Sequence, residues 1–206
     1  IDDLKDTFLQ FANSVPFYGT VCACKDSNNV ASILSKIDKP IITYGIESQN
    51  VDIKAENLHQ ENGNISFDVK VKDQIFSVNL SVPGKYNAYN ALAALSVCET
   101  MGIDLESACK ALSNFSGVKR RFDIKANKDI MIIDDYAHHP VEVQNVIETV
   151  KSNWNKNLNV IFQPHLFSRT KEFYKDFAKA LMRADNVMIT EIFASREKED
   201  NSTSSN

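Results

Sequence analysis

The chain has 206 residues and a formal net charge of −4 at pH 7; 43% of the residues are hydrophobic and 24% are charged. This length and composition allow one large or two modest domains with buried cores. The acidic balance and the absence of a Lys/Arg block argue against nucleic acid as a partner, because phosphate neutralisation needs a clustered basic face.

The sequence also lacks the marks of a secreted or membrane protein. No apolar stretch approaches the roughly 18 residues of a membrane span, and no charged-then-apolar signal begins the chain. Cys22, Cys24, Cys98 and Cys109 fit neither a CxxC pair nor the spacing of a zinc site. We therefore expect a cytoplasmic protein with reduced, buried thiols and no membrane partner.

The first 50 residues are predicted to form helix, strand, helix and strand. Asp2 and Asp3 precede an apolar helical pattern, as acidic residues should near a positive helix end. A second helix is expected after a cap at Asp26 or Ser27, because apolar residues recur at helical spacing over residues 30–37. The expected strands cover residues 20–24 and 40–44.

From residue 51 to residue 82 apolar and polar residues alternate, which is typical of antiparallel strands. Turn sequences at residues 61–63 and 72–73 divide this stretch into three runs. A three-stranded antiparallel meander is therefore predicted.

Two helices are expected next, over residues 87–101 and from Asp104 onward. Gly102 stands where a left-handed helix cap belongs. The short polar segment 113–118 separates this mixed first part from a regular unit. We place a domain boundary there, so that the domains are residues 1–117 and 118–206.

The second domain is predicted to be strand, helix, strand, helix and strand, the pattern of a parallel sheet. The expected strands are residues 130–133, 158–162 and 187–189, and the expected helices are residues 140–151 and 168–182. The fold class is therefore α/β, with an antiparallel meander in the first domain and a mainly parallel sheet in the second. Residues 197–206 are polar without apolar periodicity and are expected to form a loop.

A cluster of polar residues follows each of these three strands directly. Because ligands bind outside the carboxyl ends of the strands in open parallel sheets, we expect a ligand site there. Three of the four histidines of the chain lie in these clusters. The clusters are residues 134–139 (DDYAHH), 163–169 (QPHLFSR) and 190–197 (TEIFASRE).

The first cluster allows more than one interpretation. Asp134, Asp135, His138 and His139 could bind a metal, because carboxylate and imidazole are common metal ligands. Alternatively, a carboxylate could bind ribose hydroxyls while the imidazoles face an anionic substrate. The third possibility is a solvated loop before Pro140, which suits the first position of a helix.

In the second cluster, the start of the predicted helix offers free N–H groups to an anion. His165 and Arg169 would add charge-assisted donors at the same place, although Arg169 alone could be a solvated charge. Elsewhere, Asn87 and Asn90 share one helix face, for which local sequence alone favours capping by Asn87. Neither GxxxxGK[ST] nor GxGxxG occurs, so these residues hold no phosphate loop.

Five segments in this order together resemble the Mur ligases of bacterial peptidoglycan synthesis. The resemblance implies the later part of the central ATP-binding domain for residues 1–117 and a truncated Rossmann-like C-terminal domain for residues 118–206. It implies that the phosphate loop and the Mg²⁺ ligands lie outside this chain, which would be an inactive fragment. The segments are residues 16–19 (PFYG), 82–90 (VPGKYNAYN), 117–122 (GVKRRF), 134–140 (DDYAHHP) and 163–170 (QPHLFSRT).

The reaction that the resemblance implies joins L-alanine to UDP-N-acetylmuramate through an acyl phosphate, with ATP and Mg²⁺ as cofactors. Gln163-Pro164-His165 favours this reaction over ligation of a recovered murein tripeptide. A non-catalytic nucleotide-binding module and a metal-dependent hydrolase remain open alternatives.

The resemblance also implies roles for single residues, and it assigns no metal ligand within the chain. The residues implied to contact the nucleotide are Asn87, Asn90, Arg121, Asp135 and Tyr136. The residues implied to be catalytic, at the phosphates or facing the muramoyl acid and alanine, are Arg121, His138, His165 and Arg169.

Overall fold

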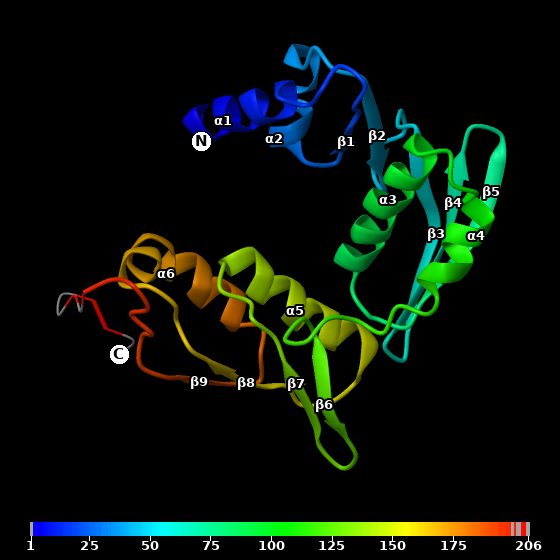
Figure 1. Cartoon of the computed structure of the whole chain (residues 1–206). Coiled ribbons are helices and arrows are strands. Elements are labelled where there is room, and N and C mark those ends of the chain that lie inside the picture. Colours follow the sequence, from blue (N-terminus) through cyan, green and yellow to red (C-terminus); the bar gives the residue numbers. More distant parts are fainter. Residues whose placement is uncertain (1, 199, 201–202, 205–206) are drawn as a thin grey trace. The chain divides into compact units, whose positions relative to one another are not determined.

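The computed structural model describes residues 2–198, 200 and 203–204. It divides into two compact units, Ile1–Ser116 and Gly117–Asn206, which are coloured from blue to green and from green to red in Figure 1. Within the described residues, no helix is long and apolar enough to cross a membrane. The loop expected over residues 197–206 lies partly outside the described residues.

The first unit is built on one five-stranded mixed sheet in the order β1-β2-β3-β4-β5. β1, β2 and β3 are parallel, whereas β3, β4 and β5 form the predicted antiparallel meander, which is confirmed. The bounds are β1 Val21–Cys24, β2 Ile41–Gly45, β3 Ile53–Glu61, β4 Asn64–Val71 and β5 Gln74–Leu80.

The helices of this unit match those predicted from the sequence except in one place. The single helix expected over residues 30–37 is a short α-helix followed by a 3-10 turn, with Ser27 as the cap. The Ser32 hydroxyl donates to the carbonyl of Asn29, and such local side-chain bonds compete with helix continuation. The bounds are α1 Asp2–Asn13, α2 Asn28–Ala31, η1 Leu34–Lys36, α3 Lys85–Thr100 and α4 Leu105–Leu112.

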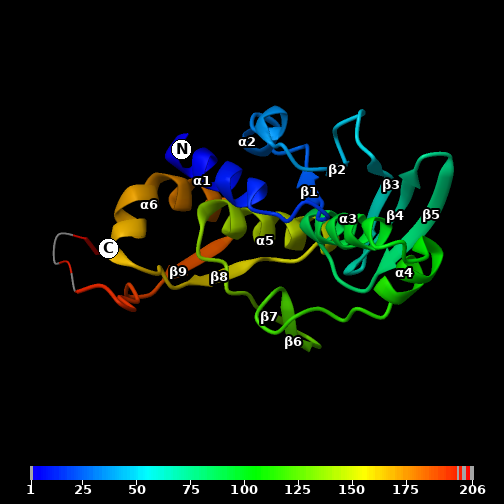
Figure 2. The same ribbon diagram turned by 45° about the horizontal axis from the view of Figure 1, so that its top comes forward.

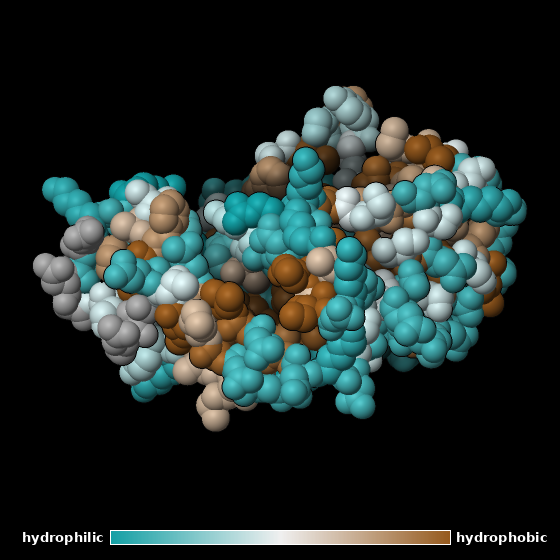
Figure 3. Space-filling view, turned by 90° about the horizontal axis from the view of Figure 1, so that it is seen from below, coloured by the Kyte–Doolittle hydropathy of each residue, from teal (hydrophilic) through white to brown (hydrophobic). Residues whose placement is uncertain are grey.

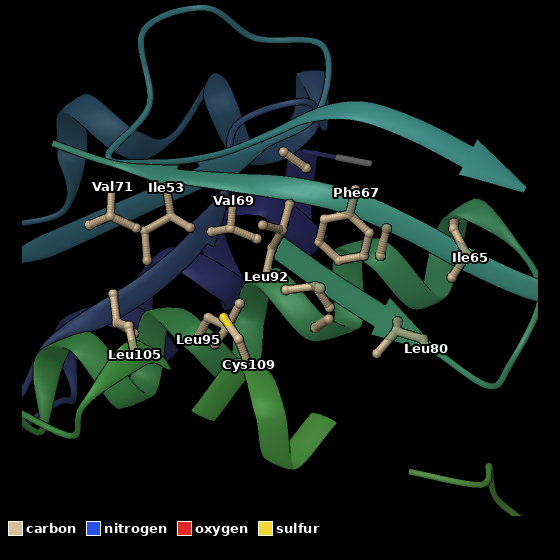
Figure 4. Packing of buried hydrophobic residues seen from close by; sticks show 14 of the residues in the cluster. Ile53, Ile65, Phe67, Val69, Val71, Leu80, Leu92, Leu95, Leu105 and Cys109 are labelled. Carbon is tan, nitrogen blue, oxygen red and sulfur yellow. The ribbon is translucent and has the colours of Figure 1, made fainter. Parts of the chain in front are cut away.

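The core of the first unit lies between the meander and two helices, as Figure 4 shows. Alternate residues of β4, from Ile65 to Val71, point at Leu92 of α3 and at Leu105 and Cys109 of α4. Burial, and then the neighbouring Cys98, raises the pKa of the Cys109 thiol to about 11. All four thiols are free, but Cys109 alone among them is buried and the other three are half-buried.

The second unit contains an antiparallel pair and a parallel pair of strands. One continuous parallel sheet was expected, but β7 pairs with β6, which the sequence did not predict, and only β8 and β9 are parallel. β6 was missed because it is mostly polar and exposed. The bounds are β6 Asp123–Asn127, β7 Met131–Asp134, α5 Pro140–Asn153, β8 Asn159–Phe162, α6 Phe167–Leu181 and β9 Asn186–Ile189.

Both helices of this unit lie on the same face of β8 and β9, as Figures 1 and 2 show. Ile147 of α5 and Phe177 of α6 pack there with Phe162 of β8. On the other face, the register partners Ile161 and Met188 are 73% and 62% exposed. Figure 3 shows apolar side chains, in brown, gathered over these strands. Parallel strands are usually covered on both faces, and within the described residues this unit covers one.

Candidate functional site

Aromatic and imidazole rings from the three polar clusters meet beside the carboxyl ends of β7 and β8. The ring centroid of Tyr136 is 5.1 Å from that of His138 and 6.4 Å from that of His165. The two histidine rings are 5.9 Å apart, and Phe193 from the third cluster lies 5.7 Å from His165. The structure thus brings together residues from all three segments that the sequence singled out.

Glu142, in the first turn of α5, holds the loop that carries His138. Its carboxylate accepts hydrogen bonds from the backbone N–H groups of His138 and His139, at 2.9 and 3.1 Å. The same carboxylate oxygen lies 3.5 Å from Nδ1 of His138, and the other oxygen lies 3.9 Å from the Arg121 guanidinium. Glu142 therefore links the two basic side chains to one rigid helix start.

His139 has a structural role. Its Nδ1 accepts a hydrogen bond from the backbone N–H of Val141, and with Glu142 it forms a reciprocal cap of α5. Pro140 occupies the first helical position, as the sequence predicts.

The carboxylate of Asp135 also accepts hydrogen bonds from the backbone. Its two oxygens each accept an N–H bond at 2.7 Å, one from Phe122 and one from Ala137. Burial raises the pKa of Asp135, and these two hydrogen bonds work against that rise. Among the described residues no group of three or more His, Cys, Asp or Glu side chains could hold a metal ion. The described residues therefore give no support to the metal-dependent hydrolase interpretation.

Arg169 and His165 are paired across one turn at the start of α6. The guanidinium donates to Nδ1 of His165 at 3.2 Å, which places the proton of a neutral ring on Nε2. Burial, followed by the positive charges of Arg169 and His138, lowers the pKa of His165. The pair offers a fixed cation beside the Nε2–H donor of a neutral imidazole, a combination that suits an anion.

We expect the pKa of His165 to lie below the usual histidine value of about 6.5, because burial, and then the nearby Arg169 guanidinium, makes charging the ring unfavourable. Arg169→Leu should move that midpoint upward by removing the positive neighbour. NMR titration of the imidazole resonances measures both midpoints. A midpoint that is equal in the two proteins would show that Arg169 exerts no field on the ring.

The start of α6 differs from the expectation of free donors for an anion. The backbone N–H and the hydroxyl of Ser168 both donate to the carboxylate of Glu197, at 3.1 and 2.5 Å. An internal anion thus occupies this position. Leu166, the residue before α6, has a φ of +70°, which is strained for a residue with a side chain.

Two residues of this site escaped the sequence analysis. Arg120 lies over the Tyr136 ring with its guanidinium carbon 4.6 Å from the centroid, and its backbone φ is +60°. Glu142 could have been found from its position three residues after the cap His139, the spacing of a reciprocal helix cap. Arg120 had no comparable signal, because a basic segment between domains is usually solvated.

Asn87 and Asn90 lie in the first unit and share a helix face, as their spacing predicts. Nδ2 of Asn90 donates to Oδ1 of Asn87 at 3.3 Å, and Nδ2 of Asn87 donates to the Pro83 carbonyl at 2.7 Å. The helix is capped by Gly84, with φ of +99°, so the interpretation of Asn87 as the cap is wrong. Oδ1 of Asn90, the second lone pair of Asn87 Oδ1 and one amide proton of each side chain remain to contact a ligand.

Two protein-family models match the chain. Residues 1–98 match the Mur ligase middle domain, and residues 120–205 match the glutamate ligase domain of Mur ligases. Together the two matches cover most of both units.

Individual relatives agree with these matches. UDP-N-acetylmuramate–L-alanine ligases from Caldanaerobacter subterraneus and Geotalea uraniireducens are 42% and 39% identical over 97% and 96% of the chain. The solved alanine ligase from Thermotoga maritima is 30% identical over 93% of the chain, with a TM-score of 0.74. A MurF ligase from the same organism, in complex with ADP, shares the fold at 20% identity and a TM-score of 0.76. The chain spans about 44% and 43% of the two curated relatives and 41% of the solved alanine ligase.

Proposed function

Because the chain belongs to the Mur ligase family, we propose that it forms part of an ATP-dependent ligase that joins L-alanine to UDP-N-acetylmuramate. In this reaction the terminal phosphate of ATP moves to the muramoyl carboxylate, giving an acyl phosphate and ADP. The amino group of L-alanine then displaces phosphate and forms the amide. We further propose that residues 1–117 and 118–206 are the later part of the central domain and most of the C-terminal domain.

The observation that supports this proposal most is the cluster at the carboxyl ends of β7 and β8. Arg169, His165 and His138 present a fixed cation and two imidazoles at one place. The muramoyl carboxylate and its phosphorylated form are anionic, and the attacking amine must lose a proton. The Arg169 guanidinium meets the first requirement. His138 meets the second, because its Nδ1–H donates to the Tyr136 carbonyl and Nε2 of the neutral ring is left to accept a proton.

The nucleotide is assigned to two other groups of residues. Asn87 and Asn90 keep amide donors and acceptors that fit the hydrogen-bonding edge of adenine. Asp135 keeps lone pairs for ribose hydroxyls beyond its two backbone bonds, and Tyr136 offers an aromatic face. Arg121, paired with Glu142 at 3.9 Å, is half-exposed and can turn to a phosphate, where its charge offsets the charge that develops in phosphoryl transfer. We assign no Mg²⁺ ligand to these residues.

The reaction itself tests the proposal. The full-length protein that carries this chain, supplied with UDP-N-acetylmuramate, ATP and Mg²⁺, should release ADP only when L-alanine is added. The isolated 206-residue chain should release none, because its sequence holds no phosphate loop. Release of ADP with a murein tripeptide in place of L-alanine would favour the recycling ligase, and ADP release by the isolated chain would contradict the proposal.

Asn90→Ala in the full-length protein should raise the KM for ATP about tenfold and leave kcat within about twofold. The adenine is unchanged during the reaction, so its contacts contribute equally to the ground state and the transition state. Steady-state kinetics with ATP and L-alanine varied independently measure both constants. An unchanged KM for ATP in a folded variant would remove Asn90 from the nucleotide site.

A further inference from the structure

The loop that follows β2, residues 46–48, is fixed by two side chains of opposite charge. The carboxylate of Asp26 accepts hydrogen bonds from its three successive backbone N–H groups, at 2.6, 2.8 and 2.7 Å. The ammonium group of Lys54, which is only 8% exposed, donates to the carbonyls of Ile46 and Ser48 at 3.0 and 2.9 Å. Both the donors and the acceptors of this loop are therefore satisfied.

Gly45, at the end of β2, makes room for this arrangement. A Cβ atom at that position would lie 2.7 Å from Oδ1 of Asp26, closer than real Cβ contacts come. The carboxylate thus packs directly against the backbone as well as bonding to the loop. Neither group can shift without disturbing the other.

The same carboxylate reaches the helix that carries the proposed adenine contacts. Oδ2 of Asp26 accepts a hydrogen bond from the Tyr89 hydroxyl at 2.9 Å, and Tyr89 lies between Asn87 and Asn90 in α3. A second link joins Glu47 of the loop to Lys85 at the start of α3 as an ion pair. Loop and helix start are therefore tied together at two points.

The location supports a role at a ligand site. β1 and β2 are parallel neighbours, so their carboxyl ends open on the same edge of the sheet. Asp26 follows β1 by two residues, and the loop follows β2 directly. Ligand crevices of such sheets lie outside this edge.

We propose that Asp26 is a positioning residue for the adenine subsite at Asn87 and Asn90. This inference rests on the proposed nucleotide-dependent function. Asp26 acts through Tyr89 and the loop: it sets where the first turns of α3 stand relative to residues 46–48. Two amide side chains can hydrogen-bond a planar base only when the helix that carries them is fixed in orientation. If α3 shifts, both asparagines are still present, but their hydrogen-bond geometry is lost.

Kinetics of the full-length protein test the inference with two variants and a control. Tyr89→Phe removes one hydroxyl and should raise the KM for ATP about three- to tenfold, while kcat and the KM for L-alanine stay within about twofold. Asp26→Asn should raise the KM for ATP by about tenfold or more. The matched control is Asp68→Asn in β4, whose carboxylate also accepts two side-chain hydrogen bonds, from Asn57 and Ser77, but lies outside this network.

The outcomes separate this inference from the proposed function. If Asn90→Ala raises the KM for ATP and Tyr89→Phe does not, the adenine site stands and the role of Asp26 is purely structural. If Asn90→Ala has no effect, the nucleotide site itself is misplaced and the inference falls with it. Should Asp26→Asn fail to fold, the Tyr89→Phe result decides alone. Equal losses in kcat and in both KM values for Tyr89→Phe would also overturn the positioning role.

Discussion

Arg169→Ala in the full-length ligase should lower kcat by on the order of 10² or more, while the KM for ATP changes little. The guanidinium is fixed by its bond to Nδ1 of His165, whose ring lies 5.9 Å from that of His138. A preorganised cation matters most where negative charge develops, which here is the acyl phosphate and the tetrahedral species that follows it. The substitution also releases His165 from its partner, so both the charge and the ring orientation are lost together.

The control for this experiment lies on the same helix. Lys179→Ala removes an exposed positive charge from the last turn of α6, away from His165, and should leave kcat unchanged. If Arg169→Ala keeps turnover within about twofold of the wild-type value in a folded protein, Arg169 is a solvated charge at a helix start. The substrate assignment at the end of β8 would then be wrong.

The sequence predicted those features of the fold that rest on local patterns. The alternation in β4 and β5 required an antiparallel meander, and Gly102, with φ of +68°, ends α3 as expected. The mixed α/β class was confirmed. β6 is short and mostly exposed, and Ile124 and Ala126 are its only apolar residues, so its pairing with β7 depends on the neighbouring strand more than on its own sequence.

In the candidate site, too, the sequence predicted what depends on local pattern and missed what depends on tertiary structure. Polar residues directly after strands predicted which segments meet, because strand ends share an edge of the sheet. The sequence could not show which donors are already occupied. Glu197 reaches Ser168 from 29 residues away, and Asp135 accepts a bond from Phe122, 13 residues away. Such long-range partners depend on tertiary structure, so the sequence could not show that the start of α6 already has an internal acceptor.

Asp26→Asn should reduce the free energy of unfolding of the first unit by about 2 to 4 kcal/mol. An asparagine of the same shape offers one acceptor and turns an NH₂ group toward N–H donors that now lack a partner. The loop would lose its charge-assisted bonds to Asp26 and keep only those to the Lys54 ammonium. Urea unfolding of the purified chain at pH 7 measures the difference.

The dependence on pH gives this prediction a second, independent measurement. Burial opposes ionisation of Asp26, but hydrogen bonds from the Ser48 hydroxyl and from the amides of residues 46–48 hold the pKa of Asp26 well below its usual range. A carboxyl group whose folded-state pKa is lowered stabilises the protein above its unfolded-state pKa of about 3.9. The difference in free energy of unfolding between wild type and Asp26→Asn should therefore be constant above about pH 5 and shrink as the pH falls below about 4.

The control is Asp68→Asn, which replaces an exposed carboxylate and should change the free energy of unfolding far less. A difference for Asp26→Asn that stayed constant down to pH 2 would mean that the lost contacts do not depend on the carboxylate charge.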